Sequence, residues 1–175
     1  CLNERAVEVP IVWQAVRAHN GKKILEIGNV LSHYFNFPHD VLDKYEMVDG
    51  VINQDVVDFH PPQKYDLIVS ISTLEHVGWD EEPKFPGKIL LAIDNLKKCL
   101  NPGGKIIITL PLGYNLEMDR MLEEGKIIFS EQYFLKRISD DNDWEEARRE
   151  EELKGIKYNH SLFTAKGLVV ALIDN

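Results

Sequence analysis

The 175-residue sequence contains only two cysteines, Cys1 and Cys99, and this pair forms neither a disulfide framework nor a metal-ligand motif. Long apolar runs are missing as well. The two longest nearly unbroken ones, residues 67–71 and 106–112, are far shorter than the roughly 20 residues that cross a bilayer. No basic stretch followed by an apolar segment opens the sequence. We therefore expect no membrane association and a cytoplasmic location.

Positive charge is also scarce, with 20 Lys and Arg against 29 Asp and Glu and a formal net charge of −9 at pH 7. Such a chain has no broad basic face to neutralise phosphates, so we expect no nucleic-acid partner. A small neutral or cationic substrate fits better. The length and the 44% hydrophobic content predict one globular domain over residues 1–175, whereas oligomeric state leaves no trace in the sequence.

Helical and strand patterns alternate along the chain. Apolar residues at spacings of three and four predict an opening helix that begins at Pro10 and stops at residues 20–21. Runs bounded by turn residues predict buried strands at 24–27 and 65–72. The same criteria predict further strands at 40–43, 51–53, 105–110, 132–138 and 167–173, a short helical or irregular stretch at 30–35, and helices at 88–100 and 116–124, with a turn at 101–104.

With right-handed crossovers, this order predicts an α/β fold in which an open parallel sheet carries helices on both faces. Residues 140–152 are highly charged, and we interpret them as a helical or mobile solvated segment. Ligands of such sheets bind outside the carboxyl ends of the strands, at the switch point of the strand order. The residues directly after the first four strands are therefore the candidate site.

Glycine and acidic residues occupy these positions. Gly28 follows the first strand, where it either lets the backbone approach a ligand or only makes a tight turn. Asp43 follows the second strand, where a carboxylate can accept both hydroxyls of a ribose. Asp55 follows the third strand and pairs with Val56, a combination suited to an adenine amino group and ring face. A solvated turn explains Asp55 equally well.

Several segments resemble class I S-adenosylmethionine-dependent methyltransferases: ILEIGN, QDVVDF, YDLIVSISTLEHVG, LNPGGKIIITLP and YFLKRIS occur in the order found in that family. The resemblance runs from about residue 23 to 174. It implies the Rossmann-like methyltransferase fold, a doubly wound, mostly parallel seven-stranded sheet whose last strand is antiparallel. It also implies S-adenosyl-L-methionine as cofactor. One departure is the first loop, which is commonly glycine-rich in the family but continues here from Gly28 to Asn29 and Val30.

The resemblance also implies roles for individual residues. Glu26 and Gly28 match the acid and glycine that face the methionine part of the cofactor, and the loop 72–77 matches the one bordering the methionine end and the substrate. Asp43 matches the ribose acid, with Glu46 and Asp49 as alternates. The cofactor-binding residues expected from the resemblance are Glu26, Gly28, Asn29, Asp43, Asp55, Val56, Ser72 and Thr73.

Methyl transfer requires an oriented acceptor and removal of its proton. His76 lies in the loop after the fourth strand, and an imidazole that titrates near ~6.5 suits a general base. A structural histidine hydrogen-bonded beneath the loop is the alternative. Tyr114, after the fifth strand, is the second catalytic candidate, or else a turn residue. Residues 80–82 form an acidic run without the spaced ligand set of a metal site, so we expect no metal.

The sequence lacks both an Asn-Pro-Pro-aromatic motif and a Pro-Cys nucleophile, which lowers the odds of DNA-base methylation. We therefore predict O-methylation of a small molecule, sugar or glycan precursor. A catalytically silent methyltransferase-like module that binds a partner protein is the first alternative, because the first loop is unusual. An NAD-dependent Rossmann enzyme is the distant one, because no G-x-G-x-x-G run is present to cradle a pyrophosphate.

Overall fold

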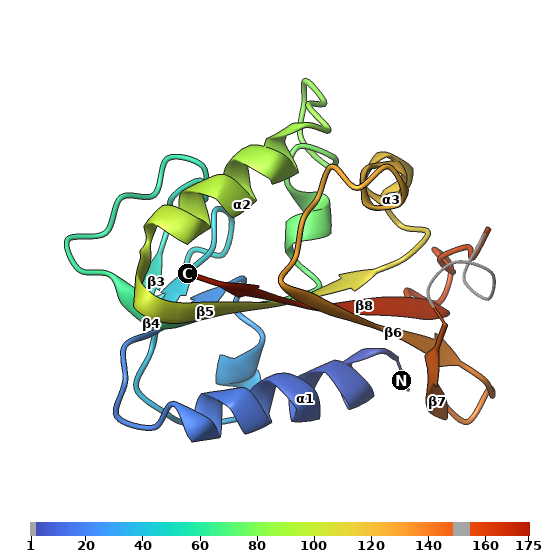
Figure 1. The fold of residues 1–175 in the computed structure, drawn as a ribbon, viewed down its shortest axis with the longest axis horizontal. Coiled ribbons are helices and arrows are strands. Elements are labelled where there is room, and N and C mark those ends of the chain that lie inside the picture. The colour runs from blue at the N-terminus through green and yellow to red at the C-terminus, as the bar shows by residue number, and fades with distance from the viewer. Residues whose placement is uncertain (1–2, 149–154) are drawn as a thin grey trace.

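The computed structural model describes residues 3–148 and 155–175, which form a single eight-stranded sheet with helices on both faces (Figure 1). The helices are α1 (Arg5–Ala18), α2 (Lys88–Lys98) and α3 (Leu116–Glu123), with 3-10 turns η1 (Leu31–His33) and η2 (Leu74–His76). The strands are β1 (Ile24–Ile27), β2 (Asp40–Leu42), β3 (Val51–Ile52), β4 (Tyr65–Ile71), β5 (Leu100–Pro111), β6 (Glu131–Arg137), β7 (Trp144–Ala147) and β8 (Gly167–Asp174).

The strand order is β3-β2-β1-β4-β5-β8-β6-β7. Strands β1 to β5 pair in parallel, while β8 is antiparallel to both β5 and β6, so β6 runs in the direction of β5. The order reverses between β1 and β4, which is the switch point where ligands of such sheets bind. The expected doubly wound, mostly parallel sheet with an antiparallel last strand is confirmed, although it contains eight strands rather than seven.

The additional strand, β7, corrects our interpretation of the charged segment as helical or mobile. It pairs antiparallel with β6, and Glu145 and Glu146 are exposed while Ala147 is buried against the core. An edge strand with one solvated side tolerates acidic residues that a central strand excludes. Residues 149–152 of that segment lie outside the described residues.

Two element boundaries also differ from those expected. Helix α1 begins at Arg5, so Pro10 lies inside the helix instead of opening it. The additional turn is helical because Glu8 and Val9 extend the buried face of the helix toward the N-terminus. Strand β5 already begins at Leu100, which pairs with Tyr65 across an irregularity in register, so residues 101–104 belong to the strand and not to a separate turn.

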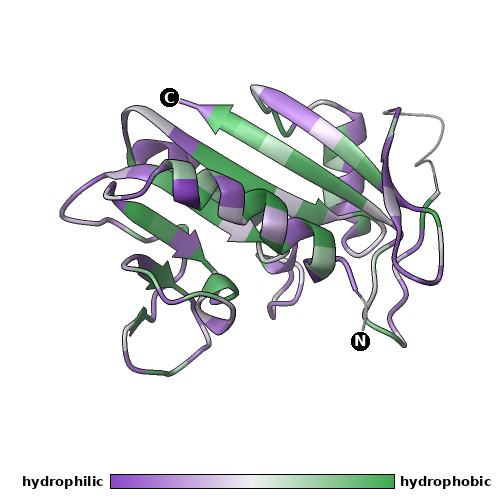
Figure 2. Ribbon diagram, turned by 90° about the horizontal axis from the view of Figure 1, so that it is seen from below, coloured by the Kyte–Doolittle hydropathy of each residue, from purple (hydrophilic) through white to green (hydrophobic). Residues whose placement is uncertain are grey.

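The core has two halves, one on each face of the sheet. Alternate residues of β4 point to opposite faces, as in any strand, so Leu67, Val69 and Ile71 pack toward α1 while Ile68 packs toward α2. Figure 1 shows α1 beneath the sheet and α2 above it, and Figure 2 shows α1 crossing the apolar strands in the view from below. None of the helices in the described ranges has the length and apolar content that a membrane crossing needs.

Candidate functional site

A pocket of about 300 Å³ lies at the carboxyl ends of β1, β2 and β4, beside the switch point. Its volume is at the lower end of the range of small-molecule sites. Six of the residues singled out from the sequence line it: Gly28, Asp43, Asp55, Val56, Thr73 and His76. Sequence positions up to 48 residues apart therefore meet in one cavity, as expected for an open parallel sheet, and their binding roles stay predictions.

Gly28 brings two loops of this pocket into direct contact. It has a φ of +79°, and its N–H donates to the Leu42 carbonyl at 2.9 Å. A Cβ added at this position would lie 2.3 Å from Oγ1 of Thr73, well inside van der Waals contact. Both the backbone conformation and the missing side chain therefore require glycine here. The close approach is to Thr73, so whether Gly28 also lets the backbone approach a ligand stays a prediction.

Asp43 closes β2 and faces the pocket from the next loop. Its Oδ1 accepts backbone N–H groups of Tyr45 and Glu46, both at 2.8 Å, which fixes the carboxylate at the mouth of the strand. Of the two alternates, Glu46 accepts a hydrogen bond from Asn29 and Asp49 is exposed, and neither lines the pocket. Of the three acids, Asp43 is thus the one that lines the pocket, and its role toward a ribose stays a prediction.

Asp55 belongs to a four-charge network formed by Lys44, Asp55, Glu81 and Lys88. Its Oδ2 lies 2.9 Å from Nζ of Lys44 and 2.5 Å from Nζ of Lys88. Glu81 contacts the same two lysines, at 3.3 Å and 2.6 Å respectively. The network joins the loops after β2, β3 and η2 to the first residue of α2, so it closes one side of the pocket.

Electrostatics within the network favour the charged form of every member. Burial alone would raise the pKa of Asp55, but its hydrogen bonds from Lys44 and Lys88 outweigh burial and lower it. The pKa of Glu81 is lowered by the same balance, with Lys88 as the main partner. The sequence analysis missed both lysines. Lys88 carried no signal beyond its place at a helix start, and the ion pairs form only because three loops meet the start of α2.

Glu26 and Asn29, both expected to bind cofactor, do not line the pocket. Glu26 is fully buried, where Oε1 accepts the N–H groups of Val30 and Leu31 and Oε2 lies 3.0 Å from Nε2 of His39. This arrangement fixes the turn after β1, so Glu26 shapes the loop that carries Gly28. Asn29 donates to Glu46 at 2.8 Å.

His76, Asp80 and Tyr114 form a hydrogen-bonded set at the other end of the pocket. Nδ1 of His76 lies 2.5 Å from Oδ2 of Asp80, and the Tyr114 hydroxyl donates to the same oxygen at 2.6 Å. Burial alone would raise the pKa of Asp80, but these two hydrogen bonds outweigh it and lower the pKa. Since an ionised carboxylate only accepts, Nδ1 of His76 is the donor in its hydrogen bond to Asp80. Tyr114 does not line the pocket itself.

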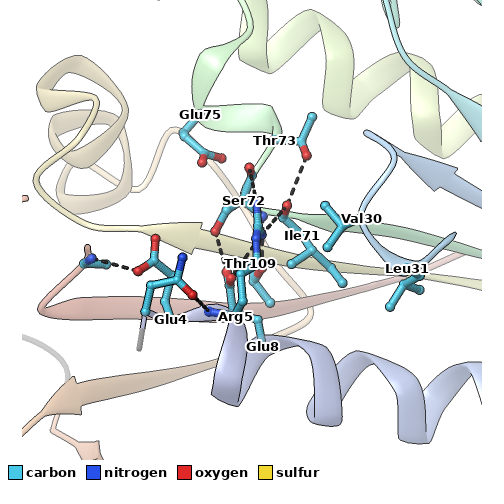
Figure 3. Close-up of polar contacts among 12 residues, drawn as sticks. Glu4, Arg5, Glu8, Val30, Leu31, Ile71, Ser72, Thr73, Glu75 and Thr109 are labelled. Carbon is cyan, nitrogen blue, oxygen red and sulfur yellow. Dashed lines mark hydrogen bonds and ion pairs between the residues drawn. The ribbon is translucent and has the colours of Figure 1, made fainter. Parts of the chain in front are cut away.

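A buried group at the start of α1 supports the loop that carries Thr73 (Figure 3). Oε1 of Glu8 accepts hydrogen bonds from the hydroxyls of Ser72 and Thr109, the latter at 2.6 Å, and Oε2 pairs with Arg5 at 3.1 Å. Arg5 also donates to the Ile71 carbonyl at 2.8 Å. Ser72 has a φ of +39°, which is uncommon for a residue with a side chain. Glu8 is thus a positioning residue for the loop after β4.

Glu75 approaches the same region from η2 (Figure 3). Its side chain is 2% exposed, Oε1 lies 3.4 Å from Nε2 of His76, and Oε2 has no hydrogen-bond partner among the described residues. Burial is the main reason that the pKa of Glu75 is raised well above its ordinary value, and the charge of Glu8 adds to this. No group of three or more side chains fit to hold a metal ion occurs in the described ranges.

No protein-family model matches the sequence, and no curated protein matches it. Solved structures do match. The N-methyltransferase NodS from Bradyrhizobium japonicum WM9, in complex with S-adenosyl-L-homocysteine, has a TM-score of 0.60 at 14% identity, and the match covers 98% of this chain and 87% of that one. A SAM-dependent methyltransferase from Archaeoglobus fulgidus has a TM-score of 0.58 at 10% identity, covering 99% and 95%. The chain therefore has the fold of class I S-adenosylmethionine-dependent methyltransferases.

Proposed function

We propose that this protein is an S-adenosylmethionine-dependent methyltransferase that acts on a small-molecule or glycan acceptor in the cytoplasm. The observation that carries the proposal is the close approach of Gly28 to Thr73 in a pocket that Asp43, Asp55 and Val56 also line. The NodS structure with the same fold holds S-adenosyl-L-homocysteine, which supports this cofactor.

The residues present fit the cofactor. Asp43 offers a fixed carboxylate to the ribose hydroxyls, Val56 offers an apolar surface to the adenine, and the bare backbone of Gly28 lets the loop that carries Thr73 close over the same pocket. When bound, S-adenosylmethionine supplies a methyl group on a positively charged sulfur. The contribution left to the protein is to orient the acceptor and to accept its proton.

His76 is the residue we assign to proton removal. Asp80 holds Nδ1, so the ring is fixed in the tautomer whose Nε2 can accept a proton. Tyr114 donates to the same carboxylate and keeps Asp80 in place. The sequence predicted a hydroxyl acceptor, and this stays a prediction, since the NodS relative is an N-methyltransferase.

The test is a calorimetric and thermal-shift titration with S-adenosylhomocysteine. A ligand that binds only the folded state, at a hundred times its dissociation constant, should stabilise the fold by about 2.7 kcal/mol. Gly28→Ala should abolish the shift because its Cβ meets Thr73. Gly125→Ala is the matched control, since Gly125 also has a positive φ but no atom within 4 Å of the added Cβ. A shift with NAD and none with millimolar S-adenosylhomocysteine would overturn the proposal.

A catalytically silent module is the second candidate, because both lysines already engage the Asp55 carboxylate that is expected to meet adenine. The same titration separates it from an enzyme when combined with a methyl-transfer assay. Cofactor binding without turnover on a broad panel of acceptors would favour the silent module.

A further inference from the structure

Four aromatic rings gather beside the candidate base, and we call His76, Tyr114, Tyr158 and His160 the ring cluster. The Tyr114 ring lies 4.7 Å from His76, 5.1 Å from Tyr158 and 5.7 Å from His160, and Tyr158 lies 5.2 Å from His160. Tyr114 and Tyr158 are half-buried and His160 is exposed, so a ligand can reach the rings from solvent.

The chain builds this cluster through one close contact of the backbone. Gly113 has a φ of +81°, and a Cβ there would lie 2.6 Å from the Ile156 carbonyl oxygen and from the Tyr158 nitrogen. A glycine is therefore required for the segment before β8 to reach the loop after β5. On the other side, the buried Asn115 donates to the Glu75 carbonyl at 2.8 Å, which ties that loop to η2.

Acidic groups outnumber cations at the buried end of the cluster. Glu4, Glu8 and Glu75 are all buried, and Arg5 pairs with Glu8. Glu4 accepts the Ala165 N–H at 2.9 Å, but no Lys or Arg in the described ranges forms an ion pair with Glu75. Oε1 of Glu75 lies 3.4 Å from Nε2 of His76, and Oε2 is buried without a hydrogen-bond partner among the described residues.

We propose that the ring cluster and Glu75 form the acceptor site and that the acceptor is an amine, which binds in its protonated form and gives one proton to His76 before its nitrogen attacks the methyl group. This inference rests on the proposed function and names its substrate class. An ammonium group is attracted to the faces of tyrosine rings within about 6 Å of their centres. Its N–H groups can also satisfy the free oxygen of Glu75, which otherwise costs desolvation without a hydrogen bond.

A hydroxyl acceptor uses these groups less well. An alcohol is neutral, so it lacks the attraction that draws an ammonium group to the ring faces. A primary ammonium carries three donors, as lysine does, whereas an alcohol carries one. The charges of Glu4 and Glu75 act in the same direction, since after burial they are the main causes that raise the pKa of Tyr158 to about 12.

The experiment compares benzylamine with benzyl alcohol, two probes of nearly the same shape. Each is titrated into protein labelled with ¹³C in its tyrosine and histidine rings, with and without saturating S-adenosylhomocysteine. We expect saturable shifts of Tyr114 and Tyr158 with benzylamine and an affinity at least tenfold above that for benzyl alcohol. Glu75→Gln should weaken amine binding at least tenfold while melting temperature and S-adenosylhomocysteine affinity stay unchanged. Glu145→Gln, an exposed carboxyl of β7, is the matched control and should change nothing.

Each other outcome overturns the inference. The first is an equal affinity for the two probes, and the second is the absence of a saturable shift with either probe up to tens of millimolar. The third is a Glu75→Gln variant with a lower melting temperature and an equally reduced affinity for both probes. The proposed function is judged separately, because S-adenosylhomocysteine binding is measured before any probe is added. If the protein binds S-adenosylhomocysteine but has the higher affinity for benzyl alcohol, only the amine assignment is contradicted.

Discussion

Two groups of carboxylates flank the site, and they differ in how their charge is balanced. In the four-charge network, Asp55 and Glu81 each contact both Lys44 and Lys88. In the buried acid group, which we define as Glu4, Glu8 and Glu75, Arg5 pairs with one member. The first group lies at the edge of the cofactor pocket and the second behind the proposed acceptor site.

The pKa values of the carboxyl groups therefore shift in opposite directions in the two groups. Contacts with lysines lower the pKa of Asp55 and Glu81, whereas burial raises the pKa of Glu8 and Glu75. The four-charge network, in which acids and lysines are equal in number, holds the loops together. The buried acid group has fewer cations than acids, so it retains a desolvated carboxyl group to which a ligand can donate a hydrogen bond. Groups with such shifted pKa values occur often at functional sites. Variants on each side test this contrast.

The largest effect is expected for Glu8→Ala, which removes the acceptor of two hydroxyls and the partner of Arg5. Breaking a buried ion pair on one side costs roughly 3–5 kcal/mol. We expect about 3 kcal/mol because Arg5 is 27% exposed. Urea denaturation measures the loss, and Glu145→Ala should stay within about 0.5 kcal/mol. A loss below 1 kcal/mol for Glu8→Ala would remove the distinction between the two groups.

His76→Ala comes next and is a test of function. The variant should bind S-adenosylhomocysteine as the wild type does and lose methyl transfer by about a hundredfold or more, as expected for a general base. Calorimetry and single-turnover assays give the two quantities. A structural histidine would instead lower melting temperature and cofactor affinity together. An unchanged rate in a folded variant would exclude the base role and make Tyr114 the next candidate.

Asp43→Ala should weaken S-adenosylhomocysteine binding at least about tenfold, because a charge-assisted hydrogen bond contributes roughly 1.5–3 kcal/mol. Asp43→Asn keeps an oxygen for the turn amides that Oδ1 now holds, so it separates the loss of charge from the loss of the turn. Asp49→Ala is the control, since Asp49 is exposed and outside the pocket. An effect at Asp49 alone would mean that the ribose acid was misassigned.

Local patterns were enough to predict seven of the eight strands and the turn residues after the first of them. The apolar runs of β1 and β4 predict buried strands without any information on tertiary contacts. The residues that follow these strands then lie at the same edge of a parallel sheet. Gly28, Asp43 and Asp55, which follow three of these strands, accordingly line one pocket, and their binding roles stay predictions.

The missed features depend on contacts between distant segments. Strand β7 has the composition of a solvated segment and is a strand only because β6 offers it an edge. Glu8 looks like an ordinary helical residue until α1 packs under the loop after β4, 64 positions away. Nor does anything near Tyr158 in the sequence indicate that its ring meets Tyr114.

The smallest effect is expected for Lys44→Ala in the balanced network. Lys44 is 36% exposed and Lys88 still holds Asp55, so the loss of unfolding free energy should stay below about 1 kcal/mol.

The pH dependence of this loss has a definite sign. Because folding lowers the pKa of Asp55 and Glu81, their stabilisation is complete above the unfolded carboxyl pKa of about 4 and disappears as pH falls through the folded values. The difference between wild type and Lys44→Ala in urea denaturation should therefore be present at pH 7 and vanish at strongly acidic pH. Lys97→Ala, which removes an exposed lysine 3.9 Å from Asp94, should show no difference at either pH. A loss of several kcal/mol for Lys44→Ala would mean that the network is as critical as the buried acid group.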